Sequence, residues 1–339
     1  MIVTPTLDPS ALRPRPEVMS IGLFGRNRAV LGRAARVVRA AANLEWVAFG
    51  DDPAQLRSQL AETTRLLLCD GADLALVLDW MSQGFPRARV VAFSHDPAAL
   101  IGAAERDDRV VSVLGWPAFQ SMPRPWELAL ATRTILSADS EATTLGDVLT
   151  GVPVAAEFRP QTHTERAATV DQIAALAERT GAGERVSTQI AAVAHELIIN
   201  ASYDAPVDAA GEPTYIHDRR APITARGREV PLVQFATDGN LVVVQVVDRY
   251  GRLTRDHVLA SIRRGQAAGT APACEVVDSS SGGAGLGIWQ VYASSAVTIV
   301  DVLPGYRTAV TAVFDIDLHA RDARTLPPSL HLFDRGRLG

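Results

Sequence analysis

Short apolar runs alternate with segments of helical periodicity over the first third of the chain. SIGLFG (20–25) and TRLLLCD (64–70) predict strands, and AVLGRAARVVRAA (29–41) has the spacing of a helix. Five such runs with helical segments between them predict a parallel sheet covered by helices on both faces. Residues 18–137 are therefore expected to form a flavodoxin-like, doubly wound α/β unit. The five predicted strands are residues 20–25, 44–50, 64–70, 88–94 and 109–116.

The pattern changes in the second half, where helices come first. A strand and a linker within the connector 138–164 precede helices expected at about 168–179 and 185–203. LVQFAT and LVVVQVVD flank Asp-Gly-Asn, a strong hairpin signal. A helix, a Gly/Ser/Ala-rich loop, another helix and two strands follow. Residues 165–320 are thus expected to be a second α/β domain, an α/β sandwich with a mixed sheet, and the Arg- and Pro-rich residues 321–339 a loosely ordered tail.

Composition narrows the functional classes. The chain has 339 residues, 47% of them hydrophobic, and a net charge of -5, which gives no broad basic surface for nucleic acid or an anionic membrane. There is no lysine, and Cys69 and Cys274 stand far apart, which excludes a disulfide framework and fits a reducing compartment. The first residues are polar and proline-rich, without an apolar run of the length expected for a signal peptide, and no apolar stretch reaches membrane-spanning length. A cytoplasmic protein is expected.

Polar side chains interrupt the apolar pattern at three places in the second half. AHELIINASYDAP places Glu196 and Asn200 one turn apart on the same face of an apolar helix, and LVVVQVVD ends in Asp248. Closely spaced glycines in GGAGLGI precede a helix, where backbone amides and the helix N-terminus favour a phosphate. An asparagine oxygen suits Mg²⁺, a strand-end aspartate can accept from an exocyclic amine, and a glutamate can polarise a hydroxyl. Together these groups predict a Mg-nucleotide site.

This order of motifs resembles the histidine-kinase-type (GHKL, Bergerat) ATPase domain. HELIINA is similar to its N box, with Glu196 at the position of the base and Asn200 at the position of the metal ligand. VVDRYG is similar to the first glycine box, with Asp248 at the adenine-reading position, and GAGLGI matches the second. The resemblance covers about Ala168–Leu318 and implies ATP or ADP with Mg²⁺ as cofactors. The nucleotide-binding residues that it implies are Asn200, Tyr203, Asp248, Tyr250, Gly251, Gly283, Gly285, Leu286 and Gly287.

The first glycine box departs from the family pattern. Tyr250 and Arg252 occupy the positions of its two usual glycines, with one glycine displaced to Gly251, and the connector 204–231 is longer than usual. Tyr250 would either close the adenine pocket or stack on the base. In the alternative hypothesis Tyr250 and Arg252 block the pocket, no nucleotide binds, and both degenerate domains serve as a scaffold for protein docking.

The histidines help to choose a branch of this superfamily. His163 lies in a polar, linker-like segment, and His195 belongs to the N box, where a packed helix histidine is an equally good interpretation. Two helices directly before the N box are similar to those of the anti-sigma-factor serine kinases. The resemblance implies a bacterial signalling protein that regulates a partner protein, with Glu196 as base in a serine/threonine kinase version and Mg²⁺ neutralising the phosphates. It also implies a tendency to form homodimers.

The first unit is similar in its order of elements to the receiver domain of response regulators. Asp70 occupies the phosphoacceptor position and Ser94 the hydroxyl position, but Arg26 stands where receivers carry a metal-binding acidic pair, and Trp116 where they carry lysine. An arginine there would repel Mg²⁺ and pair with Asp70. The competing interpretation makes Asp70 a cap of the next helix. A pseudo-receiver that signals by binding is expected.

Two further expectations concern a lid over the nucleotide site and an alternative enzyme class. Residues 255–282 are expected to act as a lid that becomes ordered on nucleotide binding, with Arg263 and Arg264 either reaching phosphates or lying on a solvated face. A dinucleotide oxidoreductase is disfavoured, because GLFGRN lacks Gly-x-Gly-x-x-Gly.

Overall fold

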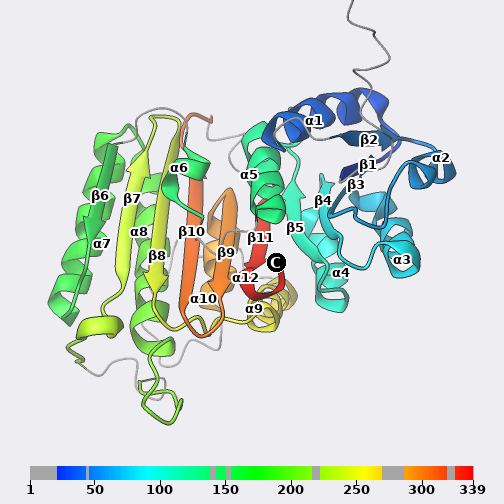
Figure 1. Cartoon of the computed structure of the whole chain (residues 1–339). Coiled ribbons are helices and arrows are strands. Elements are labelled where there is room, and N and C mark those ends of the chain that lie inside the picture. Colours follow the sequence, from blue (N-terminus) through cyan, green and yellow to red (C-terminus); the bar gives the residue numbers. More distant parts are fainter. Residues whose placement is uncertain are drawn as a thin grey trace, which may run out of the picture.

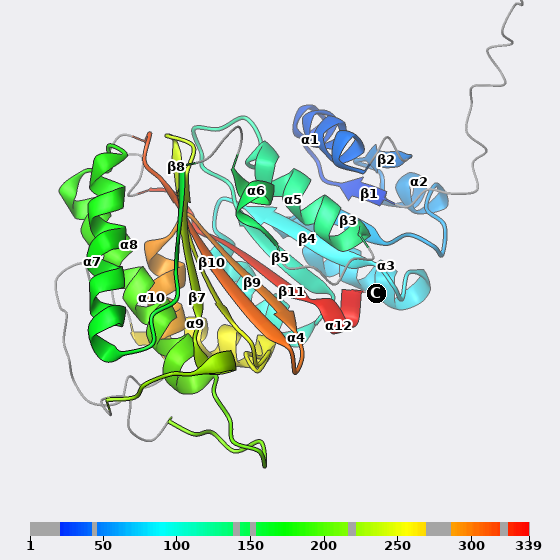
Figure 2. The same cartoon turned by 60° about the vertical axis from the view of Figure 1, so that its left-hand side comes forward.

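A computed structural model describes residues 21–42, 46–137, 143–149, 154–215, 222–268, 286–318 and 325–338. Within these residues eleven strands form one continuous sheet, in the order β2-β1-β3-β4-β5-β11-β9-β10-β8-β7-β6 (Figures 1 and 2). Helices lie against both faces of this sheet. The predicted α/β class is confirmed. The domain boundaries stay a prediction, since a single sheet runs through both units.

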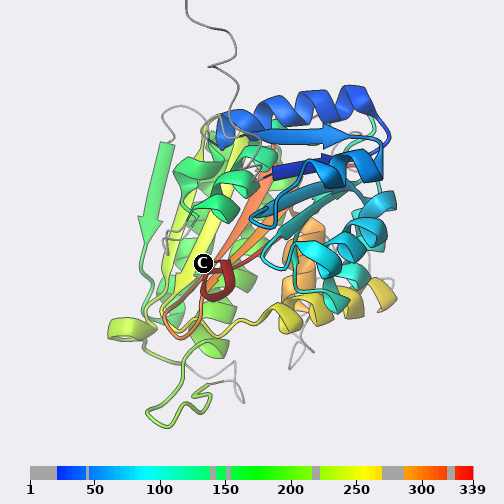
Figure 3. The ribbon, with the colours of Figure 1, turned by 45° about the vertical axis from the view of Figure 1, so that its right-hand side comes forward.

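The first half of the sheet is parallel and has the predicted order 2-1-3-4-5. Its strands are β1 (Ile21–Phe24), β2 (Val47–Gly50), β3 (Leu66–Asp70), β4 (Arg89–Ser94) and β5 (Val110–Gly115). One face packs against α1 (Arg28–Ala41) and α5 (Pro125–Leu136), and the other against α2 (Pro53–Ser58), α3 (Leu74–Gly84) and α4 (Ile101–Arg106) (Figure 3). Because both faces are covered, the inner strands are apolar throughout, as in parallel sheets generally.

Helix α1 shows how the sequence forms these elements. Val30, Leu31, Ala34 and Val38 recur at helical spacing and are buried against the sheet. The helix begins after Asn27, whose side-chain Oδ1 accepts a hydrogen bond from the amide of Val30 at 3.2 Å. The apolar spacing and the cap together fix the position and the start of this helix.

In the second half of the sheet, which runs in the order β9-β10-β8-β7-β6, every pair of adjacent strands is antiparallel. Its strands are β6 (Val154–Phe158), β7 (Leu232–Thr237), β8 (Leu241–Asp248), β9 (Val297–Leu303) and β10 (Arg307–Asp315). The predicted hairpin joins β7 to β8 through Gly239, whose φ of +94° suits glycine. One face is covered by α7 (His163–Arg179), α8 (Glu184–Ile199), α9 (Arg255–Ala268) and α10 (Gly287–Ser294) (Figure 1). The short helix α6 (Leu145–Val148) packs on the opposite face.

The two halves are joined by a strand that the sequence did not reveal. β11 (Ser329–Asp334) lies between β5 and β9, antiparallel to the first and parallel to the second. Its residues from Ser329 to Phe333 are all buried, and α12 (Arg335–Leu338) follows. The prediction of a loosely ordered tail over 321–339 is therefore wrong for 329–338. This segment completes the sheet, since it supplies the only pairing between its two halves within the described residues.

A buried polar network holds β11 in place. The His331 ring lies 2.9 Å from the Ser112 hydroxyl through Nδ1 and 3.3 Å from Glu127 Oε1 through Nε2. The second oxygen of Glu127 accepts from Arg124 Nη1 at 2.7 Å, and the same nitrogen donates to the Ser329 hydroxyl at 3.2 Å. All five residues are buried. Polar groups are tolerated in the middle of the sheet because most of their donors and acceptors satisfy one another, with Arg124 Nη2 as the exception.

A second set of polar contacts fixes the segment after β11. Asp301 on β9 is 1% exposed, and its carboxylate accepts from Arg335 Nε at 3.0 Å. The same carboxylate accepts from both the amide and the hydroxyl of Thr143 at 2.9 Å.

Among the described residues, none of the helices has the length and apolar character that a membrane span requires.

Candidate functional site

Helix α8 carries the polar stripe that the sequence predicted. Its apolar residues face the sheet, and the chain continues into a π-helical turn, Asn200–Asp204, in which the amide of Ala205 donates to the carbonyl of Asn200 at 3.1 Å. Glu196, Asn200 and Asp204 are four residues apart and follow one side of this helix. π-helical turns are often found at functional sites. Glu196 and Asn200 belong to the predicted motif, whereas Asp204 does not.

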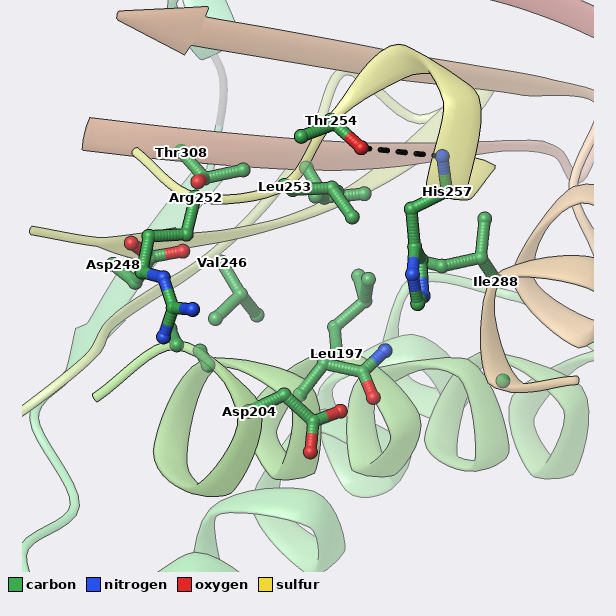
Figure 4. A pocket seen from close by; sticks show the side chains of 15 residues that line it. Leu197, Asp204, Val246, Asp248, Arg252, Leu253, Thr254, His257, Ile288 and Thr308 are labelled. Carbon is green, nitrogen blue, oxygen red and sulfur yellow. Dashed lines mark hydrogen bonds between the residues drawn. The ribbon is translucent and has the colours of Figure 1, made fainter. Parts of the chain in front are cut away.

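A cavity of about 350 Å³ opens beside this stripe (Figure 4). It lies between α8, the ends of β8 and β10, the segment before α9 and the start of α10. Of the predicted site residues, Asn200, Asp248 and Gly287 line it. The lining residues are Leu197, Asn200, Ala201, Asp204, Ala205, Val246, Asp248, Arg252, Leu253, Thr254, His257, Gly287, Ile288, Thr308 and Val310. The structure thus brings together parts of all three sequence motifs.

Asp248 forms one end of the cavity. Its side chain is 8% exposed, and Oδ1 accepts from the amides of Tyr250 at 2.7 Å and Gly251 at 3.2 Å. Burial raises the pKa of this carboxyl group above its ordinary value, although the amide of Tyr250 acts in the opposite direction. Thr308 on β10 is its partner in the strand register and also lines the cavity. This end therefore presents a buried carboxylate beside a threonine.

The other end of the cavity lies at the start of α10. A Cβ atom on Gly287 would lie 2.6 Å from Glu196 Oε2 and 3.6 Å from both polar atoms of the Asn200 side chain. Only glycine fits there without displacing these groups. Leu286 occupies the N-cap position of α10, while Gly283 and Gly285 lie outside the described residues. The predicted base and metal positions are therefore both adjacent to a helix N-terminus.

Arg252, which belongs to the altered first glycine box, and His257, which belongs to no motif, also line the cavity. Arg252 extends from the loop after β8 along one side of the cavity, and His257 points from the first turn of α9 toward α8 (Figure 4). The amide of His257 donates to the Thr254 hydroxyl at 3.2 Å, which fixes the start of α9. No sequence pattern pointed to Thr254 or His257, because only the packing of α9 on α10 brings them to the cavity.

The two predicted tyrosines lie elsewhere, which corrects the expectation for both. Tyr203 is 1% exposed, and its hydroxyl accepts from Arg166 Nη2 at 3.1 Å. The Tyr250 ring packs under the guanidinium of Arg228, 4.3 Å from the ring centroid. Neither lines the cavity, because an arginine holds each ring in another part of the domain. Tyr250 neither closes nor blocks the pocket in this structure.

Gly251 also has a structural position rather than a place in the cavity. Its φ is +63°, and a Cβ atom there would lie 2.2 Å from the carbonyl oxygen of Leu303 and 2.8 Å from the amide of Gly305. The Gly305 amide donates to the Gly251 carbonyl at 3.2 Å. The glycine lets the loop after β8 pack directly against the β9–β10 turn.

We expect Gly251→Ala to lower the free energy of unfolding by about 2–4 kcal/mol, because it combines left-handed backbone strain with a backbone clash. The matched control is Gly211→Ala, where φ is +87° but no atom lies within 4 Å of the added Cβ, so only about 1–2 kcal/mol is expected. Urea unfolding of both variants measures the difference. Equal losses would show that the close approach to Leu303 contributes nothing.

In the structure Asp70 acts as a cap, as the competing interpretation expected. Asp70 Oδ1 accepts from the amide of Ala72 at 2.9 Å and caps the 3-10 turn Gly71–Asp73. Arg26 does not pair with Asp70; its Nε lies 3.7 Å from Asp73 Oδ1. Burial raises the pKa of Asp73, and the charge of Arg26 opposes that shift.

The other two predicted receiver positions are also engaged locally. The Ser94 hydroxyl accepts from the amide of Asp96 at 3.0 Å, and the buried Trp116 donates through Nε1 to the carbonyl of Gln120 at 2.9 Å. Within the described part of the chain, no three His, Cys, Asp or Glu residues gather closely enough to hold a metal. The contacts of Ser94 and Trp116 are local structural contacts at the ends of β4 and β5.

Comparisons with known proteins add little to this geometry. Neither the protein-family models nor the curated proteins give a match to the chain. Among solved structures, the chain is similar to one from the crystal structure of the SiaB-SiaC complex from Pseudomonas aeruginosa. The identity is 15% over 48% of this chain and 88% of that chain, with a TM-score of 0.31. A similarity this low carries no inference about the fold or the function.

Proposed function

We propose that the chain binds ATP or ADP with Mg²⁺ in the cavity between α8, β8, α9 and α10, and that nucleotide binding regulates a partner protein in a bacterial signalling pathway. One observation carries the proposal: a single cavity has buried Asp248 at one end and the Asn200–Gly287 contact at the other. Its volume of about 350 Å³ lies within the range of small-molecule sites.

The end near Asp248 suits a purine base. A carboxylate oxygen held by backbone amides is fixed in direction and can accept from an exocyclic amine. Thr308, its neighbour in register, offers a hydroxyl that can donate to a ring nitrogen. Apolar side chains from α8, β8, β10 and α10 would contact the faces of the ring; they are Leu197, Val246, Ile288 and Val310. Adenine matches this set of donors and acceptors.

The end near α10 suits phosphates and a magnesium ion. The amide groups at the start of α10 and its partial positive charge favour an anion. The Asn200 side-chain oxygen is a hard ligand, which Mg²⁺ prefers together with phosphate oxygens and water. A metal site completed by the nucleotide agrees with the lack of a three-residue protein cluster in the described residues.

In the kinase version, Glu196 receives the proton of a partner's serine or threonine hydroxyl. The hydroxyl oxygen forms a bond to the γ-phosphorus while the bond from that phosphorus to the β,γ-bridging oxygen breaks, and ADP leaves. Glu196 does not itself line the cavity, but its Oε2 would lie 2.6 Å from a Cβ atom on Gly287, which does, so its carboxylate is next to the end proposed for the phosphates. Phosphoryl transfer is a more specific hypothesis than nucleotide binding, so it is tested once binding has been measured.

Calorimetric titration with ATP and ADP, with and without Mg²⁺, tests the proposal. Wild type is expected to bind with a micromolar Kd that depends on Mg²⁺. Asn200→Ala is expected to lose the Mg²⁺ dependence and about 10–100-fold in affinity, whereas Asp248→Asn weakens binding by a similar factor with and without Mg²⁺. Asp70→Asn, in the first half, is the control and should bind as wild type does.

The scaffold alternative makes a distinct prediction in the same titration. Failure of wild type to bind at millimolar nucleotide contradicts the proposal. Arg252 is the one departure from the family pattern whose side chain does line the cavity, so binding restored by Arg252→Gly would identify this arginine as the block. Absence of binding in both proteins would favour a scaffold that uses both halves for protein docking.

A further inference from the structure

Helix α9 belongs to the second half of the chain but is attached to the first. Arg255, its first residue, is partly buried, and its Nη2 donates to the carbonyl oxygens of Ala104 and Val110, each at 2.7 Å, and of Asp107 at 3.4 Å. These carbonyls lie at the end of α4 and the start of β5. One guanidinium group therefore spans the two halves.

The chemistry of the contact between Arg255 and these carbonyls indicates that it is strong. The last carbonyls of a helix have no partner within the helix and carry its partial negative charge, which favours a cation. A second contact lies along the same helix, where Arg263 Nε is 3.3 Å from Glu105 Oε1. Arg263 is exposed, so this ion pair contributes much less. Of the two alternatives for Arg263, its exposed side chain agrees with the solvated helix face.

The same helix forms a wall of the nucleotide cavity. Thr254 and His257, on either side of Arg255, both line it. On its other flank α9 packs tightly on α10: a Cβ atom on Gly265 would lie 2.0 Å from the Trp289 ring, and the Trp289 amide donates to the Ser261 hydroxyl at 3.2 Å. Any displacement of α9 is therefore passed to the start of α10, where Gly287 meets Glu196 and Asn200.

A second cavity shows where such a displacement can arise. It has a volume of about 330 Å³ and lies between the halves, with Arg89 and Val111 from the first and Val300 and Pro304 from the second among its lining residues. Leu253 and Thr254 line both cavities. This short segment separates the two cavities, and the unfilled space behind it leaves the segment and α9 room to move.

We propose that the first half of the chain sets the nucleotide affinity of the second by holding α9 in place through Arg255. The inference rests on the proposed nucleotide-binding function. Arg255 does not line the nucleotide cavity; it is a positioning residue for the wall formed by Thr254 and His257. By linkage, nucleotide binding tightens the α4–α9 contact by the factor by which that contact tightens nucleotide binding. A partner that displaces the loop between α4 and β5 would therefore release the nucleotide.

The test compares Arg255→Ala with a matched control. Arg65 makes the same kind of contact within the first half alone, since its two terminal nitrogens donate to the carbonyls of Leu136 and Ile135 at 2.9 and 3.0 Å at the end of α5. Both substitutions lower the thermal unfolding midpoint. Only Arg255→Ala is expected to weaken Mg-ATP binding, by at least tenfold, with less than a twofold change in Arg65→Ala. Arg255→Lys restores part of the affinity, because it keeps the charge and one nitrogen that can donate to these carbonyls.

Hydrogen exchange supplies a readout that needs no mutation of the cavity. In Arg255→Ala without nucleotide, amides in both α9 and α10 should exchange faster. In wild type, Mg-ATP should slow exchange in α4, which has no residue in the nucleotide cavity. Equal Mg-ATP affinity in wild type and Arg255→Ala overturns the inference and leaves nucleotide binding intact. Absence of binding by wild type itself overturns the proposed function and this inference with it.

Discussion

A chain that ends after Leu318 is expected to be unfolded or aggregated, although the deleted segment looks like a tail in the sequence. The deletion removes β11, which pairs with β5 on one side and β9 on the other. It exposes two strand edges in the middle of the sheet and takes five consecutive buried residues out of the core. Because a domain is stable by only about 5–15 kcal/mol, no native state is expected to survive this loss.

Circular dichroism and urea unfolding of the shortened chain measure the effect. Wild type should unfold cooperatively, whereas the shortened chain should show no cooperative transition. Addition of a peptide covering residues 319–339 is the control, and it should restore part of the native signal by filling the gap between β5 and β9. A monomeric shortened chain with near-wild-type stability would show that β11 is dispensable.

Replacement of Glu127 by alanine is expected to lower the free energy of unfolding by about 3–5 kcal/mol. The glutamate is fully buried, and its loss leaves Arg124 as a buried cation without its carboxylate and His331 without one partner. The matched control is Glu105→Ala, which removes an ion pair to the exposed Arg263 and should cost at most about 1 kcal/mol. Equal losses in urea unfolding would contradict the importance of the network.

The same network gives stability a pH dependence. Burial opposes ionisation of Glu127, but the charge of Arg124 and the hydrogen bond from His331 outweigh it, and the pKa is lowered. The ionised carboxylate therefore stabilises the fold fully above the unfolded-state pKa of about 4.3, and this contribution is lost as the pH falls from there through the folded-state pKa. The difference in unfolding free energy between wild type and Glu127→Gln should narrow below about pH 4.

Local signals explain why much of the fold could be predicted. β1 to β5 are apolar runs separated by helices, and both the strands and their order are confirmed. β11 gave no such signal. Its six residues, SLHLFD, follow Pro327 and Pro328, and a histidine stands in their centre. That histidine is satisfied by Ser112 and Glu127, which are 219 and 204 positions away in the sequence. No pattern within the segment encodes those partners.

The candidate site, like the fold, could be predicted only in part from local sequence patterns. Asn200, Asp248 and Gly287 belong to motifs with recognisable spacing, and the structure brings them to one cavity. Position in a motif does not determine the direction of a side chain, and the rings of Tyr203 and Tyr250 are held away from the cavity by arginines from other segments. Asp204, Thr254 and His257 belong to no motif. They reach the cavity only through the packing of helices, which the local sequence does not specify.

The position of β11 has a consequence for how the protein is made. β5 acquires its neighbour only after more than two hundred further residues have been synthesised, and closing so long a loop is entropically costly and slow. Until residue 334 has left the ribosome, β5 and β9 each present an open edge, and edges of this kind invite aggregation. The two halves of the sheet therefore complete their folding together. If recombination divided the coding sequence between them, each product would contain an incomplete sheet, so the two halves are expected to be inherited as one unit.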